Sequence, residues 1–151
     1  MSKEIVVPVV VDTNVLIPSI YRSSYLFNFI LSGNLVLVWN QFIYDEAERI
    51  AIDMWNSYVR RRTRNSLKDT LNLLRLVFEV GYSVHDMPDD WPNVSNDRDD
   101  DSFLWAAENG KTEYIISHDR RHMIALRSFK GIPIGNPASF FSWAISNYPM
   151  T

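Results

Sequence analysis

The chain has 151 residues, of which 46% are hydrophobic and 22% charged, and this balance predicts one globular domain over residues 1–151 and excludes a disordered chain. It has no cysteine, which excludes a disulfide scaffold and a thiolate metal site and fits a cytoplasmic protein, and we expect neither a signal peptide nor a membrane span. The net charge of −3 excludes a general attraction to nucleic acid, so such a partner would need a local basic patch or a metal ion.

Predicted strands and helices alternate along the chain. The β-branched run over 5–11 predicts a first strand, placed mainly from Val9 onward because Pro8 lies inside the run. Further strands are expected over 35–39, 82–85, 113–117 and 132–135. Helices are expected over 25–31, from Asn40 to Met54, over 58–80, over 103–109, and after Asn136. This alternation predicts a three-layer α/β/α fold with a mainly parallel central sheet.

Acidic residues follow the predicted strands. The stretch VVVDTNVLI, residues 9–17, places Asp12 directly after a run of three valines, where a carboxylate is costly unless something satisfies it. Asp119 follows the strand at 113–117, and Glu46 lies early in the helix after the strand at 35–39. The run Asp99–Asp101 lies in the loop and first turn before the helix expected over 103–109, which Gly110 closes. Since sites in open parallel sheets form at the carboxyl ends of strands, four segments could bring acids to one rim.

Such a cluster of carboxylates favours a hard divalent cation. Carboxylates at close range repel one another, and a bound cation removes the conflict. With no cysteine and three histidines, the donor set suggests Mg²⁺ or Mn²⁺ in preference to zinc. A metal ion of this kind can polarise a phosphoryl oxygen and supply a hydroxide for in-line attack.

The arrangement of these motifs resembles the PIN domain, the nuclease fold of many bacterial toxins of toxin–antitoxin pairs. The resemblance covers most of the chain. It rests on four stretches: VVVDTNVLI, NQFIYDEAERI, DRDDDSFLWAA and EYIISHD. The first and last stretches, at this separation, are fairly specific, whereas the second alone is weak. The family often has a proline where this chain has Arg98, and commonly Thr-Gly-Asp or Thr-Arg-Asp at Ser117-His118-Asp119.

The resemblance implies a set of functional residues. The acidic quartet it implies, both catalytic and metal-binding, is Asp12, Glu46, Asp101 and Asp119, with Asp99 and Asp100 as alternates to Asp101. Supporting roles fall to Thr13, Asn14 and Ser117. The implied function is a divalent-metal-dependent ribonuclease, a toxin with an RNA substrate, an antitoxin partner and a homodimeric state.

Simpler interpretations stand beside these. Asp12 could only cap the next helix, Glu46 could be a solvated side chain with Asp45 or Glu48 as rivals, and the aspartate run could only favour a helix N-terminus. The basic stretch YVRRRTR, residues 58–64, could be a solvated helix face or could bind phosphates through residues such as Arg60 and Arg61. Arg120 and Arg121 are better placed for a substrate phosphate, because they follow Asp119 directly.

Two other function classes remain open. One is a phosphatase with Asp12 as nucleophile, although haloacid-dehalogenase-like enzymes have Asp-x-Asp where this chain has Asn14 at the second position. The other is a binding or scaffold module with a vestigial site. A phosphate-release assay on a generic ester would separate the first from a nuclease.

Overall fold

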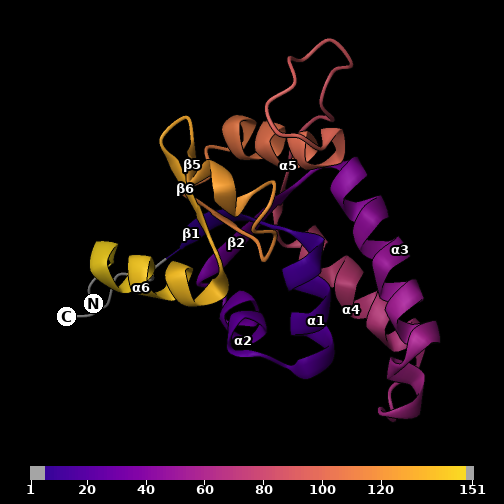
Figure 1. Ribbon diagram of the computed structural model, residues 1–151. Helices are drawn as coiled ribbons and strands as arrows, with labels where there is room; N and C mark the ends of the chain where they lie inside the picture. Colours follow the sequence, from indigo (N-terminus) through magenta and orange to yellow (C-terminus); the bar gives the residue numbers. More distant parts are fainter. Residues whose placement is uncertain (1–5, 149–151) are drawn as a thin grey trace.

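The structure is a computed structural model that describes residues 6–148 (Figure 1). Its strands are β1 (Val7–Val11), β2 (Leu35–Trp39), β3 (Tyr82–Ser83), β4 (Tyr114–Ile116), β5 (Ser128–Phe129) and β6 (Ile132–Gly135). Its α-helices are α1 (Thr13–Arg22), α2 (Tyr25–Leu31), α3 (Gln41–Ser57), α4 (Leu67–Glu79), α5 (Arg98–Asn109) and α6 (Pro137–Asn147). Two short 3₁₀ helices are η1 (Val59–Arg61) and η2 (Ile124–Leu126).

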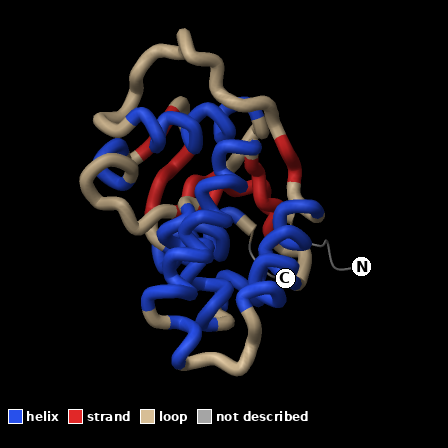
Figure 2. The backbone as a smooth tube through the Cα atoms, turned by 90° about the vertical axis from the view of Figure 1, so that its right-hand side faces the viewer, coloured by secondary structure: helices blue, strands red, loops and turns tan. Residues whose placement is uncertain are grey.

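The strands form one sheet in the order β3-β2-β1-β4-β6-β5, in which only β5 runs antiparallel to its neighbour. Helices lie on both faces (Figure 2). Val38 of β2 meets Gly110 at the end of α5, whereas the next residue, Trp39, packs its ring on Phe78 of α4 at 5.2 Å between centroids. Because successive strand residues point to opposite faces, α4 and α5 cover opposite faces of the sheet. The predicted α/β/α fold with a mainly parallel sheet is confirmed.

Pro8 lies within β1, although β1 has a strand on each side. The reason is that the missing N–H is not needed there. The N–H of Val7 donates to Asn34 in front of β2, so the backbone of Pro8 faces the other way, toward β4, where its carbonyl accepts from Glu113. Regular pairing with β4 begins only at Val9, so no ladder hydrogen bond is lost. The strand therefore begins two residues before the predicted start.

The single helix predicted over 58–80 is wrong. The chain leaves α3 after Ser57, passes through η1 and a turn, and begins α4 at Leu67. The cause is a capping box, in which the Ser66 hydroxyl accepts from the N–H of Asp69 while the Asp69 carboxylate accepts from the N–H of Ser66. The result is a hairpin of α3 and α4 that carries the basic stretch at its tip.

Other differences concern element ends. The strand predicted over 82–85 is limited to Tyr82–Ser83, and the two-residue β5 was not predicted. Over the described residues, no helix is long and apolar enough to cross a membrane.

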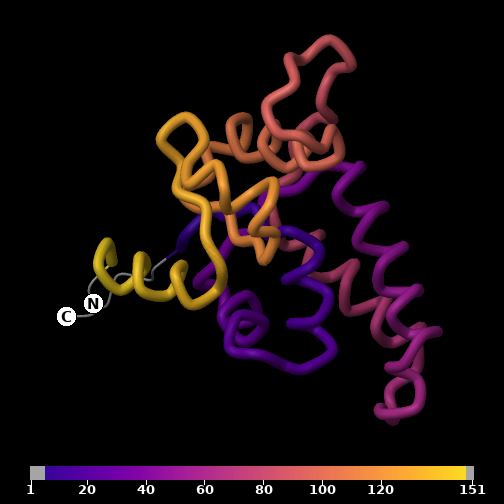
Figure 3. The backbone as a smooth tube through the Cα atoms, in the orientation of Figure 1, coloured from indigo at the N-terminus to yellow at the C-terminus, as the bar shows by residue number. Residues whose placement is uncertain are grey.

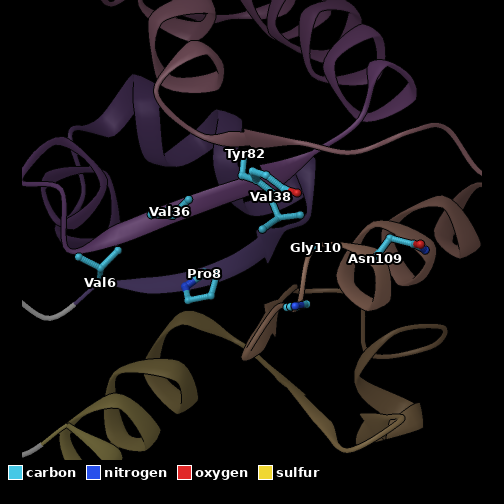
Figure 4. Close-up of a pocket in the computed structure, with 8 residues that line it drawn as sticks. Val6, Pro8, Val36, Val38, Tyr82, Asn109 and Gly110 are labelled. Atoms are coloured by element: carbon cyan, nitrogen blue, oxygen red, sulfur yellow. The ribbon is translucent and has the colours of Figure 1, made fainter.

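One apolar pocket opens on the sheet beside α5 (Figure 4). It has a volume of about 390 Å³ and is lined mainly by Val6, Pro8, Val36, Val38 and Tyr82. Val6 and Pro8 lie at the start of β1, whereas Asp12 follows its last residue. None of the predicted acidic residues lines this pocket.

Candidate active site

Asp12 lies between β1 and α1 and is 6% exposed. It caps α1, since one carboxylate oxygen accepts from the N–H of Asn14 at 3.5 Å, and the other accepts from the Ser117 hydroxyl at 2.8 Å. Burial raises the pKa of the Asp12 carboxyl, and the charge of Asp119 raises it further, while the bond from Ser117 lowers it. Asp12 therefore caps a helix, and its carboxylate also interacts with the charge of Asp119, which lies 107 residues further along the chain.

Glu46 lies in the second turn of α3 and is half-buried. Its carboxylate accepts from the hydroxyl of Thr13, the first residue of α1, at 3.1 Å. Burial raises the pKa of Glu46, and the charges of Asp12 and Asp99 raise it further. The bond from Thr13 thus turns Glu46 toward the carboxyl end of β1.

Asp119 follows β4 and joins the same network. The Ser117 hydroxyl that donates to Asp12 also accepts from the N–H of Asp119 at 3.0 Å. One carboxylate oxygen of Asp119 accepts from the N–H groups of Arg121 and His122 at 3.0 and 3.1 Å. Asn14 completes the connection, because its side-chain oxygen accepts from the N–H of His118 at 3.3 Å. The predicted supporting residues therefore hold the ends of β1 and β4 together.

Of the aspartate run, Asp100 is the residue whose charge interacts most with the other acids. The pKa of Asp100 is raised to about 7. Burial is the largest cause, and the charges of four other acids add to it: Asp12, Asp97, Asp119 and Glu46. One of its carboxylate oxygens is buried and has no hydrogen-bond partner within the described residues 6–148. Asp100 therefore has both a free ligand atom and an electrostatic cost that a cation would remove.

Asp101 has different surroundings. Its carboxylate is fully buried and accepts from the N–H groups of Val94 and Ser95, the Ser95 hydroxyl and the Arg98 guanidinium, at 2.8–3.3 Å. These bonds tie the start of α5 to the loop at 84–97, which stands out beside α5 at the top of Figure 2. Arg98 also donates to the carbonyl of Asp89 in this loop. The oxygens of Asp101 are thus engaged by the loop.

The acids fit a hard cation by the chemistry of their donors. All the candidate ligand atoms are carboxylate oxygens, and one is an unpartnered buried oxygen of Asp100. Burial and the neighbouring acids raise the pKa values of Asp12, Glu46 and Asp100. Among residues 6–148, however, no three acidic or histidine side chains already converge as a ready-made metal site.

The predicted phosphate-binding arginines fall in two places. Arg120 and Arg121 are exposed and follow Asp119, so they lie beside the acids. Arg60 and Arg61 lie in η1, beyond the far end of α3 from Glu46. Sequence reasoning missed Asp97, which caps α5 and raises the pKa of Asp100. Its position before the helix, as a preferred N-cap residue, was the available signal.

Comparisons with known proteins agree with this fold. A sequence model of the family described as PIN domain matches residues 8–121. The crystal structure of PAE2754 from Pyrobaculum aerophilum is similar in fold, with a TM-score of 0.55 and 17% sequence identity, over 91% of this chain and 90% of that one. No curated protein matches the sequence. The chain therefore belongs to the PIN domain family, as the four motifs predicted, and PIN domains are generally nucleases.

Proposed function

We propose that this PIN-domain protein is a divalent-metal-dependent ribonuclease that hydrolyses RNA phosphodiester bonds. The observation that supports it most is the coupling of four acids from four segments, because a chain gains nothing structural from bringing their charges together. Local capping explains the position of Asp12 before α1 and the bonds of Asp119 to Arg121 and His122. It explains neither the orientation of Glu46 by Thr13 nor the unpartnered oxygen of Asp100.

Asp12, Glu46, Asp100 and Asp119 are the residues that we propose hold Mg²⁺ or Mn²⁺. Asp100 replaces Asp101, the residue that the motif comparison favours, because the oxygens of Asp101 are bonded to the loop at 84–97. Asp99 is exposed and interacts with Glu46 only through its charge. We therefore place it at the edge of the acidic site and not among the metal ligands.

The protein groups have separate tasks in this proposal. When bound, the metal ion would neutralise charge on the scissile phosphate and lower the pKa of an attacking water. Thr13 and Ser117 fix the carboxylates of Glu46 and Asp12, so that their oxygens are oriented before substrate binds. Arg120 and Arg121 extend from the loop after β4 and would contact phosphates that flank the cleaved bond.

The biological setting is a further part of the proposal. The family resemblance supports a toxin of a toxin–antitoxin pair that acts in the cytoplasm. Its partner would be an antitoxin that covers the acids. A homodimer belongs to the same inference. Each is tested by co-expression with the neighbouring gene product and by the mass of the purified protein in solution.

The activity is tested by incubating the purified protein with a mixture of labelled RNA oligonucleotides and, separately, with p-nitrophenyl phosphate. We expect RNA fragments in Mn²⁺ or Mg²⁺, none in EDTA, and none from Asp12→Asn in either metal. Release of p-nitrophenol without RNA cleavage would favour the aspartate-nucleophile phosphatase. If neither substrate reacts while RNA still binds, the scaffold function would replace the nuclease.

A further inference from the structure

We propose that the turn between α3 and α4 is a second RNA-binding site, separate from the acids, in which arginines hold backbone phosphates and an adjacent pocket receives one base. We name it the arginine tip and define it by Arg60, Arg61, Arg62 and Arg64. The inference rests on the proposed ribonuclease function, since it supplies that enzyme with a place to hold RNA away from the bond that is cut.

The arginine tip concentrates positive charge on an otherwise acidic protein. Residues 58–68 hold five of the chain's 15 lysines and arginines and no acid, and the rest of the chain has ten cations against 18 acids. All four arginines are exposed. None belongs to the ion pairs formed within residues 6–148, which involve Arg49, Arg98 and Lys130. The charge is therefore available to an external anion.

The arginine tip lies far from the acids. Figures 1 and 3 show α3 running from the carboxyl end of the sheet to the tip of the hairpin, at the lower right. From Glu46 to Ser57 the helix rises about 17 Å, at 1.5 Å per residue, and Arg60 follows beyond it. The tip and the acids therefore cannot contact the same phosphate. One strand with its bases stacked as in a duplex, at about 3.4 Å per nucleotide, would need roughly five nucleotides or more to reach both.

A polar pocket adjoins the tip. It has a volume of about 230 Å³ and is lined by residues of α1, α2, α4 and the turn, among them Tyr21, Thr63, Asn65 and Asp69. Thr63 and Asn65 flank Arg64, so the pocket and the charge belong to the same few residues. A cavity of about 150 Å³ can hold a benzene molecule, so this one can accept the ring of a base.

The combination favours RNA over an acidic protein. Guanidinium groups bind phosphate in a bidentate manner, and a backbone offers phosphates on both sides of each base. The lining combines an aromatic ring, amide and hydroxyl groups and a carboxylate, which can stack on a base and bond to its edge. An acidic protein would use the arginines and leave the pocket empty.

The test is fluorescence anisotropy with a labelled 12-nucleotide oligo(U) RNA in EDTA, where no metal-dependent cleavage can occur. Arg62→Gln/Arg64→Gln is compared with Arg75→Gln/Lys111→Gln, a control that removes the same charge from other exposed positions. Loss of two phosphate contacts should weaken binding about 25-fold at 0.1 M salt and reduce the salt slope by about 1.4. The control should stay within about twofold, and melting curves show that both variants are folded.

Four results would overturn the inference or, in the last case, its base pocket. Equal loss in the control and the tip variant would mean that net charge alone attracts RNA, and no binding by the wild type would remove the site. Competition by poly-L-glutamate as strong as that by unlabelled RNA of equal charge would assign the tip to an acidic protein. A 12-mer of abasic ribose should bind at least about fivefold more weakly, and equal binding would remove the base pocket. Because binding is read in EDTA, failure of the ribonuclease assay leaves these results interpretable.

Discussion

Replacing Asp100 by asparagine is expected to raise the free energy of unfolding of the metal-free protein at pH 7.5. The pKa of Asp100 is raised from 3.8 to about 7, first by burial and then by neighbouring acids. The folded state therefore binds more protons than the unfolded state between pH 4 and pH 7. Stability from this group is present at low pH and is lost as the pH rises through about 7. Asparagine keeps the shape of the side chain and removes the charge.

The magnitude follows from the shift. A change from 3.8 to about 7 corresponds to about 4 kcal/mol if the whole shift counts. Because Asp100 is only half-buried, solvent screens much of it, and we expect a gain of about 1–2 kcal/mol. For a chain of this length that raises Tm by about 2–8 °C.

The assay is thermal unfolding in EDTA at pH 7.5 and at pH 5. The matched control is Asp99→Asn, an exposed aspartate in the same helical turn, which shares any favourable effect of the α5 N-terminus. We expect Asp100→Asn to melt above Asp99→Asn at pH 7.5 and the difference to shrink at pH 5. Equal melting of the two variants at pH 7.5, or a gain that is unchanged at pH 5, would refute the repulsion argument.

Three further predictions concern the same centre. Mn²⁺ at a hundred times its dissociation constant should stabilise the wild type by about 2.7 kcal/mol in a melting titration, and an equal gain for Asp12→Asn would contradict Asp12 as a ligand. Asp101→Asn should lower the free energy of unfolding by about 1–3 kcal/mol and speed proteolysis within 84–97, because the N–H groups of Val94 and Ser95 lose a buried, charged acceptor. Unchanged proteolysis and Tm would argue against the loop role. Ser117→Ala should move the acidic limb of the pH profile of kcat/KM to higher pH, because the Ser117 hydroxyl lowers the pKa of Asp12; a limb that stays or moves to lower pH would count against this coupling.

The sequence was informative about the sheet and the ends of its strands. Valines such as Val9, which are buried in the structure, predicted the first strand. Asp12 and Asp119 lie after strands β1 and β4, which pair directly. Once these two strands are neighbours, contact between their carboxyl ends follows from geometry. The motifs could therefore bring Asp12 and Asp119 together, whereas Glu46 on α3 came from the resemblance of the second motif.

The choice among Asp99–Asp101 could not be made from spacing. Successive residues of a helix point about 100° apart, so only one of the three can face the other acids, and which one depends on where α5 begins. Asp97 sets that start because it caps the helix. Asp101 fixes it further, because its buried carboxylate accepts from the N–H of Ser95 in the loop. Long-range contacts of this kind have no periodicity in the sequence.

The sequence does contain a sign that the helix is interrupted between α3 and α4, but the regular spacing of apolar residues obscured it. Leucines recur at helical spacing from Leu67 onward, and the preceding arginines are compatible with a helix. The pair Ser66 and Asp69 forms a capping box and fixes the start of α4 at Leu67. The arginine tip exists only because of that break.

The most direct test of the central claim compares RNA cleavage by the wild type, Asp100→Asn and Asp101→Asn in Mn²⁺, at a temperature where all three are folded. If Asp12, Glu46, Asp100 and Asp119 form one metal-dependent centre, Asp100→Asn should lose at least about 100-fold in rate, as expected when a group that orients or stabilises the reacting phosphate is removed. Asp101→Asn should remain within about tenfold of the wild type. The reverse order, or full activity in both variants, would contradict the account.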